Sequence, residues 1–172
     1  QRTEAIIRFS RQANFLLMTV KDLTFERGRT NVVLSSGKPV SSSDRAFIET
    51  RRKLVDENTI RGLAWLEKED APLAGKLRTD YSNLMRLRKK IDPVVSGGAS
   101  ADRYRLAGEW YEQTTGFIHH IINVLDIVGK KQNAPGRFAN YHRLLIDTLV
   151  FRDRIGQSGS VMTAALSENL PF

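Results

Sequence analysis

The chain has 172 residues, a net charge of +8 and no cysteine. The length suits one domain with a sizeable core, and the lack of cysteine excludes disulfides, thiolate metal sites and cysteine nucleophiles. No apolar run reaches the roughly 20 residues that cross a bilayer. The positive charge suits a small anion, nucleic acid or a lipid surface, or it is only a solvated basic surface. We expect residues 1–172 to be a single domain excised from a longer protein.

Apolar residues recur at steps of three and four along most of the chain, which predicts amphipathic helices. The first helix is expected over residues 3–36, with Gly37-Lys38-Pro39 ending it. The second begins at the capping residues 41–44, and Pro72 interrupts it. The same pattern then continues as far as Asp92-Pro93.

The second half of the chain predicts two further long helices. The third long helix is expected from Ala101 to a connection at residues 129–136, and the last helix ends at Pro171. The stripe expected to face the core in the last helix is Leu144, Thr148, Phe151, Ile155, Ser158, Met162 and Ala165.

These segments predict an all-α fold, an elongated antiparallel four-helix bundle whose second helix is broken near Pro72. Four spans would place both termini at the same end of a rod, as a domain inserted between two membrane helices requires. A fifth full-length span would place them at opposite ends. We expect a kink or a short packed-back helix at Pro72 instead.

Arg27 falls on the apolar stripe of the first helix, in step with Val20 and Leu23. A buried, unpaired guanidinium costs on the order of several kcal/mol, so Arg27 must meet an anion. That anion is either a bound ligand or a carboxylate of the protein that fixes the register of the helices. The candidate carboxylates are Asp56, Asp126, Asp147 and Asp153.

The segment Leu23–Asn31 resembles the "LQxERGxS" motif late in the first helix of nitrate- and nitrite-sensing (NIT) domains. Further segments resemble later family motifs in the same order: Arg51-Arg52 with Asp56, Leu87–Asp92, Trp110-Tyr111, and Leu144-Leu145 followed by Arg152–Gly156. The resemblance implies an extracytoplasmic sensing domain of a bacterial transmembrane signalling protein. Such a protein would be a chemoreceptor, histidine kinase or diguanylate cyclase, with the domain in the periplasm between flanking membrane helices.

Two sets of residues follow from the stripe and the resemblance together. Arg27 offers a planar fork for nitrate or a carboxylate, and neutral hydrogen bonds would come from residues one turn onward. The expected ligand-binding residues are Arg27, Thr30, Asn31, Arg52 and Arg88. The expected structural residues, which would set helix register or close approach, are Glu26, Gly28, Asp56, Asp153 and Gly156. Gly159 stands where the family's closing motif has an arginine, and this departure weighs against nitrate itself.

We expect a homodimer of parallel rods that binds a small anion, with no cofactor and no nucleic acid. Two other functions stay open: a cytosolic NIT-type regulator of transcription antitermination, and a basic helical module binding nucleic acid or an acidic protein. A structural bundle without a ligand is a further alternative. No enzyme is expected, because no serine has a base at triad-like spacing and no phosphate loop follows a strand. His119 and His120 point about 100° apart on a helix, so they do not predict a metal site.

Overall fold

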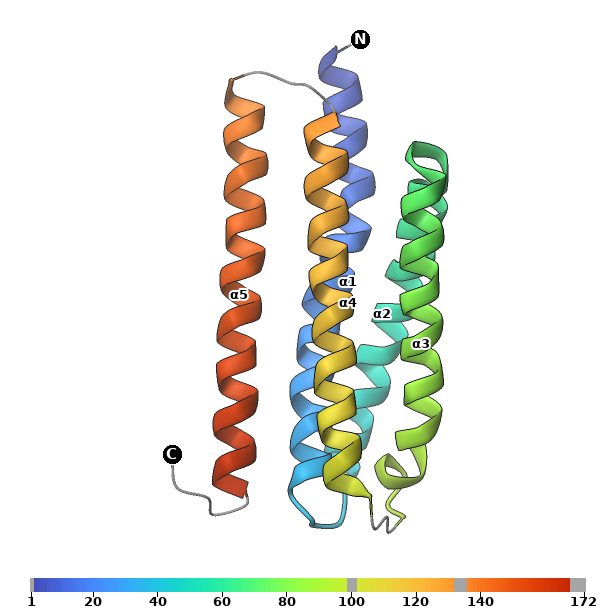
Figure 1. Ribbon diagram of the computed structural model, residues 1–172, viewed down its shortest axis with the longest axis vertical. Helices are drawn as coiled ribbons and strands as arrows, with labels where there is room; N and C mark the ends of the chain where they lie inside the picture. Colours follow the sequence, from blue (N-terminus) through green and yellow to red (C-terminus); the bar gives the residue numbers. More distant parts are fainter. Residues whose placement is uncertain (1, 99–101, 132–135, 168–172) are drawn as a thin grey trace.

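The computed structural model describes residues 2–98, 102–131 and 136–167. Those residues form five helices and no strand. The helices are α1 (Arg2–Ser35), α2 (Ser42–Glu69), α3 (Ala71–Val95), α4 (Arg103–Lys131) and α5 (Arg137–Ser167). Figure 1 shows an elongated bundle in which each helix runs opposite to the one before it. The predicted all-α bundle is confirmed, while the expected boundaries at Ala101 and Pro171 lie outside the described residues.

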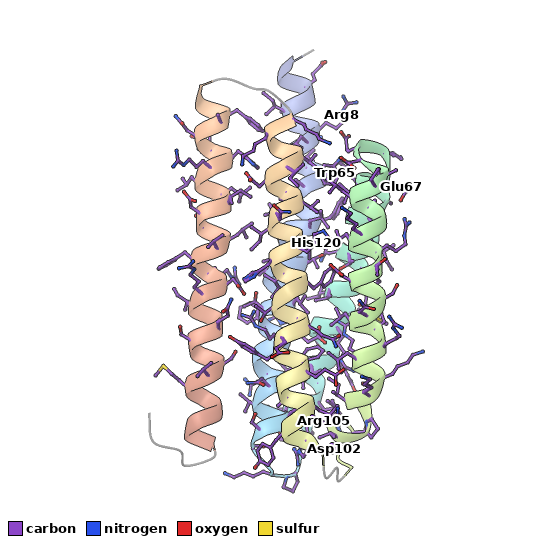
Figure 2. The ribbon with its side chains drawn as sticks, in the orientation of Figure 1. Arg8, Trp65, Glu67, Asp102, Arg105 and His120 are labelled. Atoms are coloured by element: carbon purple, nitrogen blue, oxygen red, sulfur yellow. The ribbon has the colours of Figure 1, made fainter. Side chains whose placement is uncertain are left out.

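Helices α1 to α4 form a four-helix ring, and α5 is added on its outside. In the ring, α1 packs against α2 and α4, and α3 closes the ring against the same two helices. The side chains drawn in Figure 2 fill this ring, where Trp65 of α2 meets Phe9 of α1 edge to face at 5.8 Å between ring centroids. Helix α5 packs mainly on α1 and α4.

The break expected near Pro72 is a complete reversal of the chain. The Asp70 N–H donates to the Leu66 carbonyl at 2.7 Å and ends α2, while Asp70 Oδ1 accepts from the Leu73 N–H at 3.0 Å and caps α3. Pro72 lies in the first turn of α3, where a missing N–H is tolerated. The expected kink or short helix is wrong, because α3 is a separate helix of 25 residues.

This reversal changes the predicted placement of the termini. With five helices instead of four, the N-terminal end of α1 and the C-terminal end of α5 lie at opposite ends of the rod (Figure 1). The expectation that both termini share one end is therefore wrong. Helix α3 also continues past the predicted stop at Asp92-Pro93, with Pro93 inside its last turn.

The face of α5 that was expected to be buried lies on the outside. Its large apolar members Leu144, Phe151, Ile155 and Met162 are 54–66% exposed, and the expected member Ala165 has no described side chain. The face that packs on α1 and α4 is more polar, with its buried side chains being His142, Leu149, Asp153 and Ser160.

Candidate functional site

Arg27 is fully buried and extends from α1 toward α4 and α5. Its Nη1 donates to Asp153 Oδ1 at 2.8 Å and to Thr115 Oγ1 at 3.0 Å. Its Nη2 donates to the Asp153 carbonyl at 3.4 Å, and the guanidinium carbon lies 5.6 Å from the Tyr111 ring centroid. Of the four candidate carboxylates, Asp153 on the last helix is therefore the partner of Arg27.

Asp153 is held from three helices at once. Its second carboxylate oxygen, Oδ2, lies 2.8 Å from His119 Nε2 of α4 and accepts from Gln157 Nε2 at 2.5 Å. We call Arg27, Thr115, His119, Asp153 and Gln157 the Arg27 cluster. Within the described part of the chain, Arg27 Nε has no hydrogen-bond partner. The arginine thus retains a donor that a further acceptor would satisfy.

Glu26 faces a different part of the bundle, because neighbouring residues on a helix point about 100° apart. Arg88 of α3 holds its carboxylate with two bonds, from Nε to Oε1 at 2.9 Å and from Nη2 to Oε2 at 2.5 Å. Arg52 of α2 donates from Nε to Oε1 at 3.2 Å. This geometry places a fully buried carboxylate between two guanidinium groups.

Two more acidic residues bind these arginines, and we call Glu26, Arg52, Arg88, Asp56 and Asp92 together the Glu26 network. Arg88 Nη1 lies 2.6 Å from Asp56 Oδ1, and Arg52 Nη1 lies 2.5 Å from Asp92 Oδ1. Burial raises the pKa of the Glu26 carboxyl, although Arg88 and Arg52 act in the opposite direction. Burial acts to lower the pKa of Arg88, but Glu26 and Asp56 outweigh it and raise that pKa. Both arginines of this network are therefore already paired with carboxylates of the protein, and among the described residues only Arg52 Nη2 of their buried donors has no hydrogen-bond partner.

The predicted ligand-binding residues do not converge on one site. Arg27 meets α4 and α5, whereas Arg52 and Arg88 belong to the Glu26 network among α1, α2 and α3. Thr30 and Asn31 are buried one turn beyond Arg27, and Thr30 Oγ1 has no hydrogen-bond partner among the described residues. Periodicity alone placed all five on helices without showing which helices face one another.

The two glycines expected to permit close approach differ. A Cβ on Gly156 would lie 2.9 Å from Thr24 Cγ2 and 3.2 Å from Arg27 Nη2, so α5 needs a glycine here to reach α1. A Cβ on Gly28 would lie 3.8 Å from Ser160 Oγ, an ordinary contact. The packing of α5 on α1 therefore requires a glycine at Gly156, whereas at Gly28 it leaves room for a Cβ.

A surface pocket of about 450 Å³ lies beside the Arg27 cluster, and we call it the α1/α5 pocket. Gly156 lines this pocket, and as a glycine it places no side chain between the pocket and Arg27 Nη2. The remaining lining residues are Thr24, Phe25, Gly28, Arg29, Val32, Phe47, Gly159 and Ser160. Thus the family position occupied here by Gly159 also borders this pocket.

Arginines surround the aromatic lining of the α1/α5 pocket. The guanidinium carbon of Arg51 lies 4.7 Å from the Phe25 ring centroid, and that of Arg152 lies 5.3 Å from the same centroid. Arg29 lies over Phe47 at 5.1 Å. Arg29 and Arg51 have carboxylate partners at 2.8 and 2.7 Å, respectively. The sequence pattern did not reveal this grouping, since its members come from three helices.

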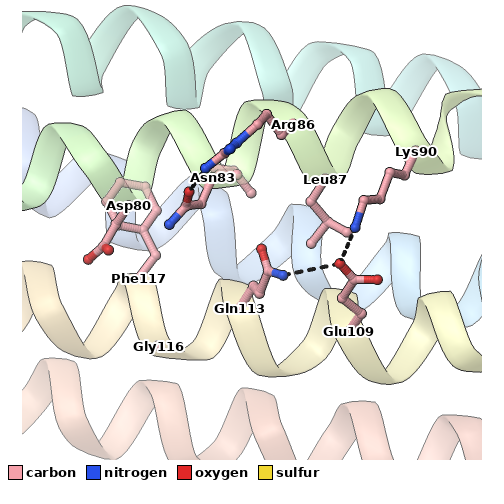
Figure 3. A pocket seen from close by; sticks show the side chains of 10 residues that line it. Asp80, Asn83, Arg86, Leu87, Lys90, Glu109, Gln113, Gly116 and Phe117 are labelled. Carbon is pink, nitrogen blue, oxygen red and sulfur yellow. Dashed lines mark hydrogen bonds and ion pairs between the residues drawn. The ribbon is translucent and has the colours of Figure 1, made fainter.

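A larger groove of about 610 Å³ runs between α3 and α4 (Figure 3). Its charged lining is mostly paired, with Lys90 Nζ 2.6 Å from Glu109 Oε1 and Arg86 donating to Asn83. Gln113 also donates to Glu109 at 3.2 Å. None of the predicted site residues lines this groove, so we do not assign it to the site.

The neighbouring histidines serve different helices. His119 contacts Asp153 of α5, while His120 Nδ1 pairs with Asp80 of α3. Within the described residues, no group of three histidine, aspartate or glutamate side chains is placed to hold a metal ion. In the same residues no helix is both long and apolar enough to cross a bilayer.

The fold and the site define an all-helical bundle whose first and last helices are joined by a buried arginine–aspartate pair. A family model described as nitrate and nitrite sensing matches residues 19–171, so the chain belongs to this family of sensing domains. The resemblance drawn from the segment around Arg27 is thereby confirmed. Comparisons with curated proteins and with solved structures gave no match.

Proposed function

We propose that this chain is the extracytoplasmic sensing domain of a bacterial transmembrane signalling protein and that it responds to a small anion in the α1/α5 pocket. The observation that supports this proposal most directly is the position of Arg27. Its buried guanidinium does not itself line the pocket, but it lies next to Gly156, which does, and a Cβ on Gly156 would be only 3.2 Å from Arg27 Nη2. Other arginines surround the aromatic lining of the pocket. Family membership supports the sensing role.

The mechanism that we propose is competition for Arg27. Nitrate, nitrite and small carboxylates present oxygen pairs like those of Asp153, so an anion entering beside Gly156 would compete for the same guanidinium. Asp153, once displaced, would keep its contacts with His119 and Gln157. Losing the bond to α1 would let α5 shift by an ångström or two against α1. The anion acts only through its higher affinity for the shifted packing.

The location outside the cytoplasm rests on the resemblance to receptor sensor regions. Because the described chain has its two ends at opposite ends of the rod, a membrane helix on each side would require a further segment that returns along the rod. Reporter fusions to the full-length protein, active only outside or only inside the cytoplasm, test this location. Activity of the cytoplasmic reporter alone would contradict it.

One observation favours the alternative of a cytosolic NIT-type regulator of transcription antitermination. Ends at opposite poles of the rod suit a domain joined in series to an output domain, with no membrane nearby. Fractionation of cells that express the tagged full-length protein separates the two functions. The receptor predicts the protein in the membrane fraction, and the regulator predicts it in the soluble fraction.

The sharpest test of the anion site uses Asp153→Asn, which keeps the shape of the side chain and removes the competing charge. We expect titration calorimetry to show that this variant binds the preferred anion about tenfold more tightly, a gain of roughly 1.4 kcal/mol in binding free energy. Nitrate, nitrite, phosphate, sulfate and small carboxylates are compared at constant ionic strength. Glu67→Gln is the control, because it makes the same charge change at an exposed residue paired with Arg78.

A second variant returns the family's arginine to the pocket. Gly159 lines the pocket, and nothing lies within 4 Å of a Cβ built there, so Gly159→Arg adds a cation without a clash. We expect this variant to bind the anion more tightly. Unchanged affinity in both Asp153→Asn and Gly159→Arg, or no saturable binding by any variant, would reject the proposed site.

A further inference from the structure

The outer face of α5 presents an apolar stripe that no described residue of the chain covers. We call it the α5 outer stripe; its members are Tyr141, Leu144, Thr148, Phe151, Ile155, Ser158 and Met162. Its five large apolar residues are 54–70% exposed. The stripe extends about 32 Å at 1.5 Å per residue. A contiguous apolar surface of this kind marks an interaction site.

The spacing within the stripe identifies the kind of partner. Its members alternate steps of three and four, which is the heptad repeat of a coiled-coil seam. Phe151 and Ile155 lie at successive core positions, and Thr148 and Ser158 are polar members on either side. We propose that the α5 outer stripe is the interface with a second copy of this chain, whose α5 lies along it as the second helix of a coiled coil.

The charges beside the stripe fit a second copy of the same helix. Asp147 precedes Thr148, and Arg152 follows Phe151, so these two occupy the flanking positions on opposite sides of the seam. In a parallel pair, such a flanking residue meets the residue five positions later on the partner helix, and Asp147 is five positions before Arg152. Two opposite-charge pairs form by symmetry. An antiparallel pair sets like flanking positions against each other, and because Arg154 occupies the same flanking position as Asp147 one heptad later, it also forms two Asp147–Arg154 pairs. The charges therefore fit a second copy in either direction.

The surroundings of the two charged residues allow these pairs. Asp147 is exposed and makes no ion pair with a side chain that the structure describes. Arg152 is half-buried, with its guanidinium over Phe25. The second copy therefore supplies a charge to each of two residues that the single chain leaves at its surface. The proposal does not depend on anion binding.

Sedimentation equilibrium of the 172-residue chain tests the interface directly. We expect a dimer that Phe151→Glu together with Ile155→Glu weakens more than about tenfold, since both side chains are exposed in the monomer and buried in the dimer. The control is Ile60→Glu on α2, an equally exposed isoleucine outside the stripe. A monomer at every concentration, or equal weakening by Ile60→Glu, overturns the proposal.

Cysteine cross-linking tests the direction, because the chain has no cysteine of its own. Thr148→Cys and Ser158→Cys each place a thiol on the seam at an exposed polar position. A parallel pair in register brings each thiol next to the same thiol of the partner, so both variants form disulfide-linked dimers on oxidation. An antiparallel pair brings at most one of them together. Cross-linking of both variants identifies the parallel pair, and cross-linking of one or neither identifies the antiparallel pair of a chain that sediments as a dimer. Equal cross-linking by Ser82→Cys on α3 overturns the proposed interface.

Discussion

Arg27 of α1 and Asp153 of α5 form an ion pair of 2.8 Å between side chains that are 0% and 1% exposed. The pair joins the first helix to the last across 126 positions of sequence. Because each charge loses its partner while staying buried, we expect Arg27→Ala and Asp153→Ala each to lower the free energy of unfolding by about 3–5 kcal/mol. Urea denaturation followed by circular dichroism measures both values.

A double-mutant cycle separates the pair from its surroundings. Arg27→Met and Asp153→Leu are measured singly and together. We expect the double variant, which removes both charges, to be more stable than the summed losses of these two single variants predict. Strict additivity of the two effects would show that the pair contributes no coupling energy of its own.

The Glu26 network gives a second stability prediction. Glu26→Gln removes the buried charge shared by Arg88 and Arg52, which keep only the more exposed Asp56 and Asp92 as carboxylate partners. We expect a loss of about 3–5 kcal/mol in the free energy of unfolding. Glu67→Gln breaks an exposed pair with Arg78 and should cost less than about 1 kcal/mol. Equal losses in the two variants would contradict the buried role of Glu26.

Two neighbouring glycines of α5 provide a matched comparison of packing. Gly156→Ala forces a Cβ to within 2.9 Å of Thr24, so we expect it to destabilise the protein by about 1–3 kcal/mol. Gly159→Ala adds its Cβ to open space within the helix and should stabilise it by up to about 1 kcal/mol. Thermal unfolding of both variants checks the opposite signs, and a stabilising Gly156→Ala would contradict the close approach.

The start of α2 predicts a dependence on pH. The Ser41 hydroxyl and then Arg29 lower the pKa of Asp44, so the folded state binds a proton less readily than the unfolded state. The stabilisation from Asp44 is therefore present above the ordinary aspartate pKa of about 3.9 and is lost as the pH falls through the lower pKa of the folded state. Asp44→Asn should remove this part of the acid dependence, measured as unfolding free energy against pH. Parallel curves for the variant and the parent chain would contradict it.

The sequence predicted where the helices lie along the chain better than which helices pack against one another. The stripe that contains Arg27 indicated a buried arginine, because helical periodicity identifies which face of a helix is buried. Asp153 was among four candidate partners, but periodicity does not show which helices meet. The family motifs grouped Arg52 and Arg88 with Arg27, although the structure places them on the Glu26 side of α1.

Helix α5 shows why the more apolar stripe is not always the inner one. Both faces of α5 follow a three-four spacing, and the outer one has more large apolar residues. The inner face reaches α1 and α4 through small or polar residues, with Gly156 against Thr24 and His142 against Gly129. Likewise, the reversal at Asp70 needs one residue between two helices, so the apolar repeat continues through it almost without interruption.

The polar inner face of α5 divides the protein into two parts of unequal cohesion. Helices α1 to α4 share a continuous apolar core, whereas the described side chains through which α5 joins it include one buried aliphatic residue, Leu149, and two partly buried apolar residues, Phe138 and Ile146. Detaching α5 therefore exposes less hydrocarbon to water than opening the four-helix ring and breaks a few specific polar contacts. Amide hydrogens of α5 should exchange through a local opening that costs less free energy than global unfolding. Those of the four-helix ring should exchange only through global unfolding.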